Sequence, residues 1–212
     1  MKRILQTTWL LGAALLFCLA APGFADSVTF STTGTFSGGA CASSGSVCST
    51  GSGVSLSFEG LTNATVTPDQ PGKGGTLFTF NSLGNFDASA GSLTNFNGVS
   101  FTLDISQSAP AASPSSGSLL ASLSGSLQTT SSGTEVIFSN PTSITLGGVT
   151  YQISSFTMDG PGVVLSPYTT NGGVTTLQGK ISEVAVPEPS AMLLLGSGLL
   201  SLAGLRKRLF SI

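Results

Sequence analysis

Charge and histidine are the scarcest features of this chain. Charged residues make up 8% of its 212 positions, and histidine is absent, whereas an ordinary soluble domain is about one-quarter charged. Without histidine, Ser-His-Asp and Cys-His catalytic sites are excluded, and with only three cysteines a zinc site is disfavoured. The single tryptophan, Trp9, lies in the first segment. We therefore expect no metal, no other cofactor and no tryptophan-lined sugar site in the main body.

Basic residues are concentrated at the two ends of the chain. Five of the seven are Lys2, Arg3, Arg206, Lys207 and Arg208. Between Asp26 and Val186, two basic residues stand against eight acidic ones, a net charge of -6. Nucleic acids bind through clustered lysine and arginine, so we exclude them as partners. Hydrophobic residues reach 40%, which supports a buried core rather than a disordered chain.

The first 25 residues have the layout of a secretory signal peptide. Lys2 and Arg3 give a positive start, Trp9–Ala21 is almost wholly apolar, and small residues precede the bond between Ala25 and Asp26. This order predicts a signal peptide over residues 1–25, carried by the Sec machinery and removed by signal peptidase. A retained membrane anchor and a buried helix are the alternatives.

The last segment has three parts in a fixed order. They are Pro187-Glu188-Pro189, the apolar run 191–205, and the basic cluster Arg206-Lys207-Arg208. The prolines block a helix from extending back through them, which leaves Glu188 in an accessible linker. A helix over the apolar run would be about 22 Å long, shorter than the ~30 Å hydrocarbon core. A weak single-pass anchor with its basic end in the cytoplasm is the simple interpretation.

The last segment, with its Pro-Glu-Pro triplet, apolar run and basic end in this order, resembles the PEP-CTERM sorting domain of Gram-negative bacteria. The resemblance implies recognition by the membrane protease exosortase, with cleavage near Pro187-Glu188-Pro189 and Glu188 as part of the substrate. It also implies transient residence of segment 184–212 in the inner membrane as a transmembrane helix, with Arg206, Lys207 and Arg208 as a cytoplasmic stop. The body would then reach the cell surface or the extracellular space, in association with extracellular polysaccharide or biofilm matrix.

The body, 26–183, alternates apolar with polar residues in short runs. The predicted strands cover 28–32, 54–58, 99–105, 119–127, 136–138, 144–146, 149–153 and 174–177. Period-two alternation is typical of half-buried strands, and Gly147-Gly148 predicts a hairpin turn. Proline and glycine mark loops at 69–75 and 109–117. These features predict an all-β antiparallel β-sandwich, with a barrel as the alternative, and place most phenylalanines in the core.

Two cysteines, Cys41 and Cys48, remain after removal of the signal peptide. An even pair in an exported protein predicts a disulfide, which would add about 2.5 kcal/mol to stability in the chain-entropy model. Two free thiols are the alternative.

Candidate active-site residues are few and isolated. Glu59, Glu135 and Glu183 are the glutamates from which a glycosidase pair would have to come, but no local pattern singles out two of them, and surface acids are the simpler interpretation. Lys73 and Lys180 lie in polar surroundings and are expected to be solvated. We expect no enzymatic activity.

The sequence leaves three roles for the body. A structural surface or matrix protein is the first, a carbohydrate- or Ca²⁺-binding module is the second, and a glycoside hydrolase is the third. Tyr168, which follows Pro167 in an expected loop, is the better tyrosine for a sugar contact, whereas Tyr151 falls on a strand and is expected in the core.

Overall fold

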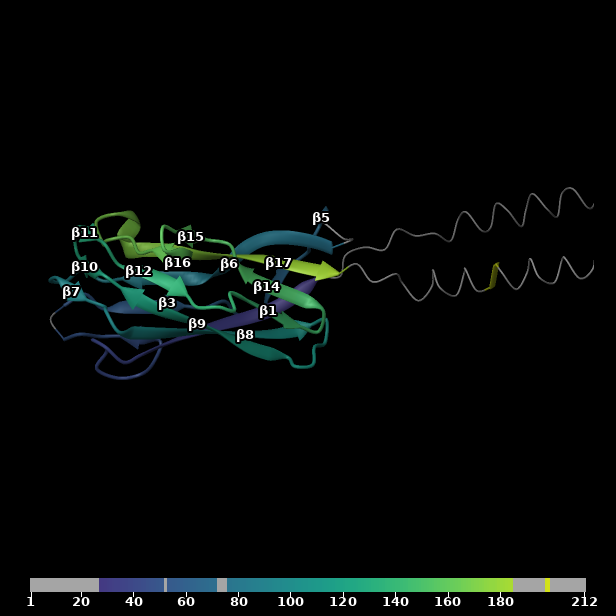
Figure 1. Ribbon diagram of the computed structural model, residues 1–212, viewed down its shortest axis with the longest axis horizontal. Coiled ribbons are helices and arrows are strands. Elements are labelled where there is room, and N and C mark those ends of the chain that lie inside the picture. Colours follow the sequence, from purple (N-terminus) through teal and green to yellow (C-terminus); the bar gives the residue numbers. More distant parts are fainter. Residues whose placement is uncertain (1–26, 52, 72–75, 185–196, 199–212) are drawn as a thin grey trace, which may run out of the picture. The chain divides into compact units, whose positions relative to one another are not determined.

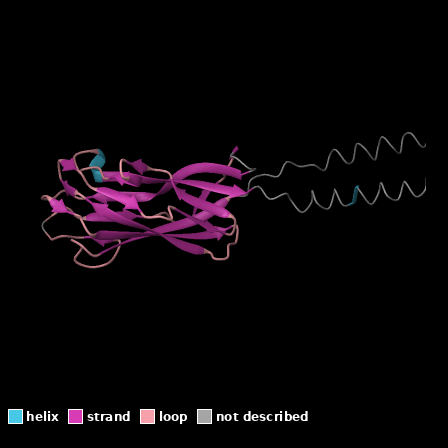
Figure 2. Cartoon of the chain, in the orientation of Figure 1, coloured by secondary structure: helices cyan, strands magenta, loops and turns pink. Residues whose placement is uncertain are grey.

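The computed structural model describes residues 27–51, 53–71, 76–184 and 197–198. Of these, residues 27–51, 53–71 and 76–184 belong to one compact unit. Strands dominate this unit, and its short helical turn is the 3-10 segment η2, Asn171–Gly173 (Figure 2). The predicted all-β class is confirmed.

The strands form two large antiparallel sheets and one small one. Sheet I has the order β15 (Phe156–Thr157), β16 (Gly160–Val164), β12 (Glu135–Phe138), β9 (Ser116–Ser124), β8 (Val99–Ala109), β1 (Val28–Ser37) and β4 (Ala64–Val66). Sheet II has the order β13 (Ser143–Leu146), β14 (Val149–Ile153), β17 (Val174–Val184), β6 (Thr76–Ala88), β3 (Leu56–Glu59) and β2 (Val47–Cys48), with β5 (Gln70–Pro71) also paired to β6. The small sheet joins β11 (Ser131–Ser132), β10 (Ser126–Gln128) and β7 (Thr94–Asn95).

Alternation along each strand creates the core between the sheets. In β8, the buried residues Val99, Phe101, Leu103 and Ile105 alternate with residues that are exposed or half-buried. In Figure 1, β8 and β9 of sheet I lie along one side of the body, while β15 and β16 of the same sheet lie near β6 and β17 of sheet II. Rings from both sheets meet inside. Phe36 of β1 lies 6.2 Å from Phe86 of β6, measured between ring centroids. The two sheets therefore share one hydrophobic core.

Glycine permits the closest approach in this core. Gly34 on β1 faces inward, and a Cβ atom built on it would overlap the rings of Phe58 and Phe101. Those two rings lie 5.0 Å apart between centroids. The absence of a side chain at position 34 thus makes room for an aromatic pair that joins the two sheets.

The predicted hairpin at Gly147-Gly148 is confirmed. Leu146 pairs with Val149 in the β13–β14 ladder, and both intervening glycines have positive φ, 53° and 94°. Two-residue hairpins with positive φ at both central positions match the twist of the strands they connect. Glycine is favoured there because it reaches positive φ without a Cβ clash.

Some predicted boundaries were wrong. The run 119–127 is two strands, because Gly125 turns the chain at φ 98° and sends β10 into the small sheet. The segment 69–75, expected as a loop, contains the short strand β5. The expected loop 109–117 is shorter, since β8 extends to Ala109 and β9 begins at Ser116. The long strand β6 was not predicted.

Candidate functional surfaces

The termini of the body lead to the two predicted processing regions. Ala25 and Asp26, at the expected signal cleavage site, lie outside the described residues, and so do Pro187-Glu188-Pro189 and Arg206-Lys207-Arg208. β17 ends at Val184, so the predicted sorting segment follows the last strand directly. Within the described part of the chain, no helix is long and apolar enough to cross a membrane.

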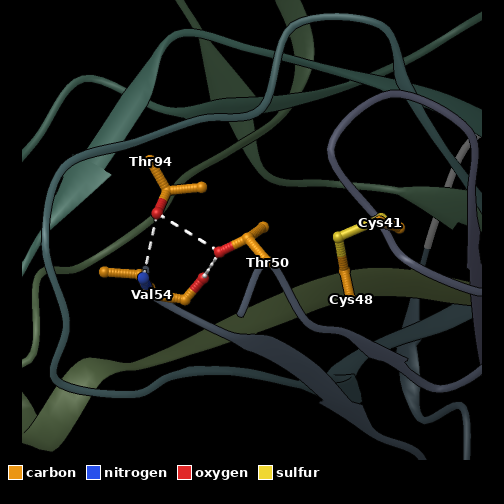
Figure 3. The surroundings of a disulfide bond; sticks show 5 residues. All are labelled: Cys41, Cys48, Thr50, Val54 and Thr94. Carbon is orange, nitrogen blue, oxygen red and sulfur yellow. Dashed lines mark hydrogen bonds between the residues drawn. A yellow bond between two sulfur atoms is a disulfide. The ribbon is translucent and has the colours of Figure 1, made fainter. Parts of the chain in front are cut away.

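The predicted disulfide between Cys41 and Cys48 is present (Figure 3). Its Cα atoms are 4.6 Å apart and its sulfurs 2.03 Å apart. Cys48 is buried in the core and Cys41 packs against it from a partly buried position. The backbone N–H of Ala42 donates to the carbonyl of Ser49 at 3.1 Å. The bond therefore fastens the loop between β1 and β2 to the body.

Next to the disulfide, threonine hydroxyls hold the following turn to β7 (Figure 3). The backbone N–H of Val54 donates to Oγ1 of Thr94 at 2.9 Å, and Oγ1 of Thr50 donates to the carbonyl of Val54 at 3.2 Å. These hydroxyls bond to the main chain, so the cluster fixes the position of residues 50–54 and offers no activated nucleophile.

Removing the disulfide is expected to weaken the fold measurably. The double substitution Cys41→Ser and Cys48→Ser should lower the free energy of unfolding by about 2.5 kcal/mol, because the denatured chain regains the freedom of the open loop. Urea denaturation of the exported protein measures the change. Reductant should shift the wild-type midpoint toward that of the variant and leave the variant unmoved. Equal midpoints for all samples would contradict this role.

The candidate carboxylates do not converge in sheet II. Glu59 pairs with Asn85, which pairs with Thr176 of β17, while Glu183 lies seven residues further along β17. At about 3.3 Å per residue, Glu59 and Glu183 are separated by roughly 23 Å along the sheet. A glycosidase pair requires carboxyl groups within about 10 Å. Glu135 belongs to the other large sheet. Among the described residues, no group of three or more candidate ligands is placed to hold a metal ion.

The two tyrosines lie where the sequence placed them. Tyr168 is 47% exposed in the turn after β16. Tyr151 is fully buried on β14, and its hydroxyl donates to Oε1 of Gln107 at 3.0 Å. Nε2 of Gln107 donates in turn to the carbonyl of Pro110 at 2.7 Å. Burial raises the pKa of Tyr151 far above the ordinary value.

Because Tyr151 is buried, we expect the folded protein to lose stability at high pH. An unfolded tyrosine ionises near pH 10, whereas folded Tyr151 keeps its proton, so the unfolded state binds fewer protons there. Stability contributed by this group is complete below about pH 10 and falls above it by up to about 1.4 kcal/mol per pH unit. Tyr151→Phe should flatten that slope, as measured by urea denaturation between pH 8 and 11. An unchanged slope would show that ionisation of Tyr151 does not cause the loss of stability at high pH. Only the slopes are compared, because the hydrogen bond lost in Tyr151→Phe lowers stability at every pH.

Over β1, β8 and β9, the outer side of sheet I carries mostly hydroxyl groups, and we refer to this three-strand surface as the hydroxyl face. Its cross-strand rows over β1, β8 and β9 are Ser31–Ser106–Ser116, Thr33–Asp104–Ser118, Thr35–Thr102–Leu120 and Ser37–Ser100–Ser122. Oγ of Ser118 donates to Oδ1 of Asp104. Lys180 is the single basic residue in the described part of the chain, and it lies in sheet II. Among the described residues, the hydroxyl face is therefore a mostly polar surface with one acid, no cation and one exposed leucine, Leu120.

The class of protein follows from the segment after β17. Residues 185–208 match the family model described as the PEP-CTERM protein-sorting motif, which confirms the resemblance inferred from Pro187-Glu188-Pro189 and the basic end. The chain is thus a secreted protein sorted to the cell envelope or surface. It is a PEP-CTERM domain-containing protein, and the motif makes exosortase its processing partner. Neither the curated proteins nor the solved structures compared with the chain include a match.

Proposed function

We propose that this protein is a structural component of the cell surface or extracellular matrix, without catalytic activity. Its body, a β-sandwich, is exported by the Sec machinery, held in the inner membrane through segment 184–212, and then delivered outside by exosortase. The observation that carries the proposal is the PEP-CTERM motif at residues 185–208, which follows directly on the last strand of an all-β body.

The surface chemistry of the body supports a structural role. The hydroxyl face is hydrophilic and almost uncharged, so it stays hydrated without attracting counterions or polyelectrolytes. The separation of Glu59 from Glu183 along sheet II disfavours a glycosidase pair made from these two residues. A glycoside hydrolase therefore ranks below a structural role.

The test compares matrix cohesion in the native host with and without this protein. Deleting the protein should lower the shear needed to disperse the matrix, and returning the wild-type chain should restore it. A chain carrying Glu59→Gln, Glu135→Gln and Glu183→Gln, checked for native circular dichroism, should restore cohesion equally well. If deletion leaves cohesion unchanged, the structural role is wrong. If the folded triple variant fails to restore it, the glutamates act chemically and the hydrolase alternative takes precedence.

A further inference from the structure

The outer side of sheet II carries an aromatic and cationic cluster. Phe78 and Phe80 lie on β6, two residues apart on the same side, with ring centroids 5.6 Å apart and an interplanar angle of 77°. Lys180 on β17 pairs directly with Phe80. Its Nζ atom lies 4.4 Å from the centroid of the Phe78 ring.

Phe80 is the open member of this cluster. Phe78 and Lys180 are half-buried, since the lysine covers the Phe78 ring with its ammonium group. Phe80 remains 54% exposed, although a phenylalanine on a strand normally faces the core or a neighbouring side chain. The Phe80 ring lies on the stretch of β6 between the parts that pair with β5 and with β3, and together with the covered Phe78 ring it forms an aromatic pair open to solvent on one side.

Amide side chains lie beside the rings. Gln152 on β14 pairs with Lys180 and is exposed. Gln178 is two residues from Lys180 on β17, on the same side, and is also exposed. Each amide offers two N–H donors and one acceptor oxygen. We name Phe78, Phe80, Gln152, Gln178 and Lys180 the Phe80 platform: one exposed ring with donors and acceptors along one side.

Size and charge decide which partner fits the Phe80 platform. A stable protein–protein contact buries about 1,200–2,000 Å² in total around several apolar anchors, and this platform offers one exposed ring. Between Asp26 and Val186 the chain has a net charge of -6, which repels polyanions. A pyranose ring has an apolar C–H face of the size of a phenyl ring and a rim of hydroxyl groups. It therefore matches an exposed ring flanked by amides and one ammonium group.

We propose that the Phe80 platform binds an uncharged polysaccharide. One pyranose ring stacks on Phe80, and its hydroxyl groups exchange hydrogen bonds with Gln152, Gln178 and the ammonium of Lys180. The inference deepens the proposed function and rests on it, because a matrix supplies the polymer and repeated sugar units compensate for a weak single contact.

Affinity electrophoresis of the exported, purified protein tests this proposal. Gels contain hydroxyethylcellulose, dextran or carboxymethylcellulose, the last being a charged counterpart of the first. At least one neutral polymer should retard the wild-type protein, and more strongly than carboxymethylcellulose does. Phe80→Ala should weaken that binding about tenfold. Phe156→Ala removes a ring that is 71% exposed on β15 of sheet I, and should leave binding unchanged.

Three results would overturn the assignment: no retardation by either neutral polymer, stronger retardation by carboxymethylcellulose, or equal retardation of wild-type protein and Phe80→Ala. The matrix assay separates this failure from failure of the structural role. If Phe80→Ala protein restores matrix cohesion as well as wild-type protein does, the platform is dispensable while the structural role stands. If wild-type protein restores nothing, the structural role itself fails.

Discussion

Glu188→Ala is expected to trap the protein in the inner membrane. In the sequence, Glu188 stands between two prolines, and because proline does not extend a helix backwards, we expect the triplet to be accessible to a protease. Loss of its carboxylate removes the one charge in the triplet, so exosortase should no longer recognise the chain. Membrane fractionation and surface labelling should show nearly all of the variant with the inner membrane, and little or none at the surface.

The matched control is Glu59→Ala, which removes an exposed carboxylate from β3 outside the sorting segment. It should reach the surface as the wild-type chain does. A host lacking exosortase should retain wild-type protein just as the normal host retains Glu188→Ala. Normal surface delivery of Glu188→Ala would show that this carboxylate is not part of the signal.

Phe101→Ala is expected to cause the largest loss of stability in the body. Phe101 lies on β8 between the sheets, and its ring contacts four others, with centroid separations of 4.9 Å to Phe36, 5.0 Å to Phe58, 4.9 Å to Phe86 and 6.3 Å to Phe138. Truncation leaves a cavity among rings from both sheets. The free energy of unfolding should fall by about 3–5 kcal/mol, a large part of the ~5–15 kcal/mol typical of a domain.

Urea denaturation measures this loss, with Phe156→Ala as the control. The Phe156 ring is largely in water, so its removal should change stability by no more than about 0.5 kcal/mol. Phe101→Leu fills part of the cavity and should give an intermediate value, which keeps the test informative if the alanine variant does not fold. Similar midpoints for Phe101→Leu, Phe156→Ala and wild-type protein would refute the placement of Phe101 at the centre of the core.

Local patterns were sufficient for much of the fold. Strict alternation over 99–105 predicted β8, because each inward residue there is apolar and each outward one polar. Gly147-Gly148 predicted its hairpin because few other residues reach the required φ angles. The pairing of Cys41 with Cys48 followed from the count of cysteines in an exported chain.

The strand β6 escaped prediction because its pattern changes partway. The register with β17 shifts between Leu177 and Gln178, which leaves Leu83 as an extra residue in β6. A bulge of this kind moves the later side chains to the opposite faces. Phe78 and Phe80, which precede the bulge, therefore point outward, whereas Phe86 and Ala88, which follow it, point into the core. The sequence prediction places most phenylalanines in the core. The Phe80 platform was missed for the same reason, since it requires the pairing of β6 with β17.

Mass spectrometry of the surface form from the native host tests the central claim most directly. We predict an N-terminus at Asp26 and a C-terminus near Pro187, which means that the processed chain lacks both apolar segments. A surface form that still carries residues 206–212, or a chain with both ends intact in the cytosol, would contradict the account.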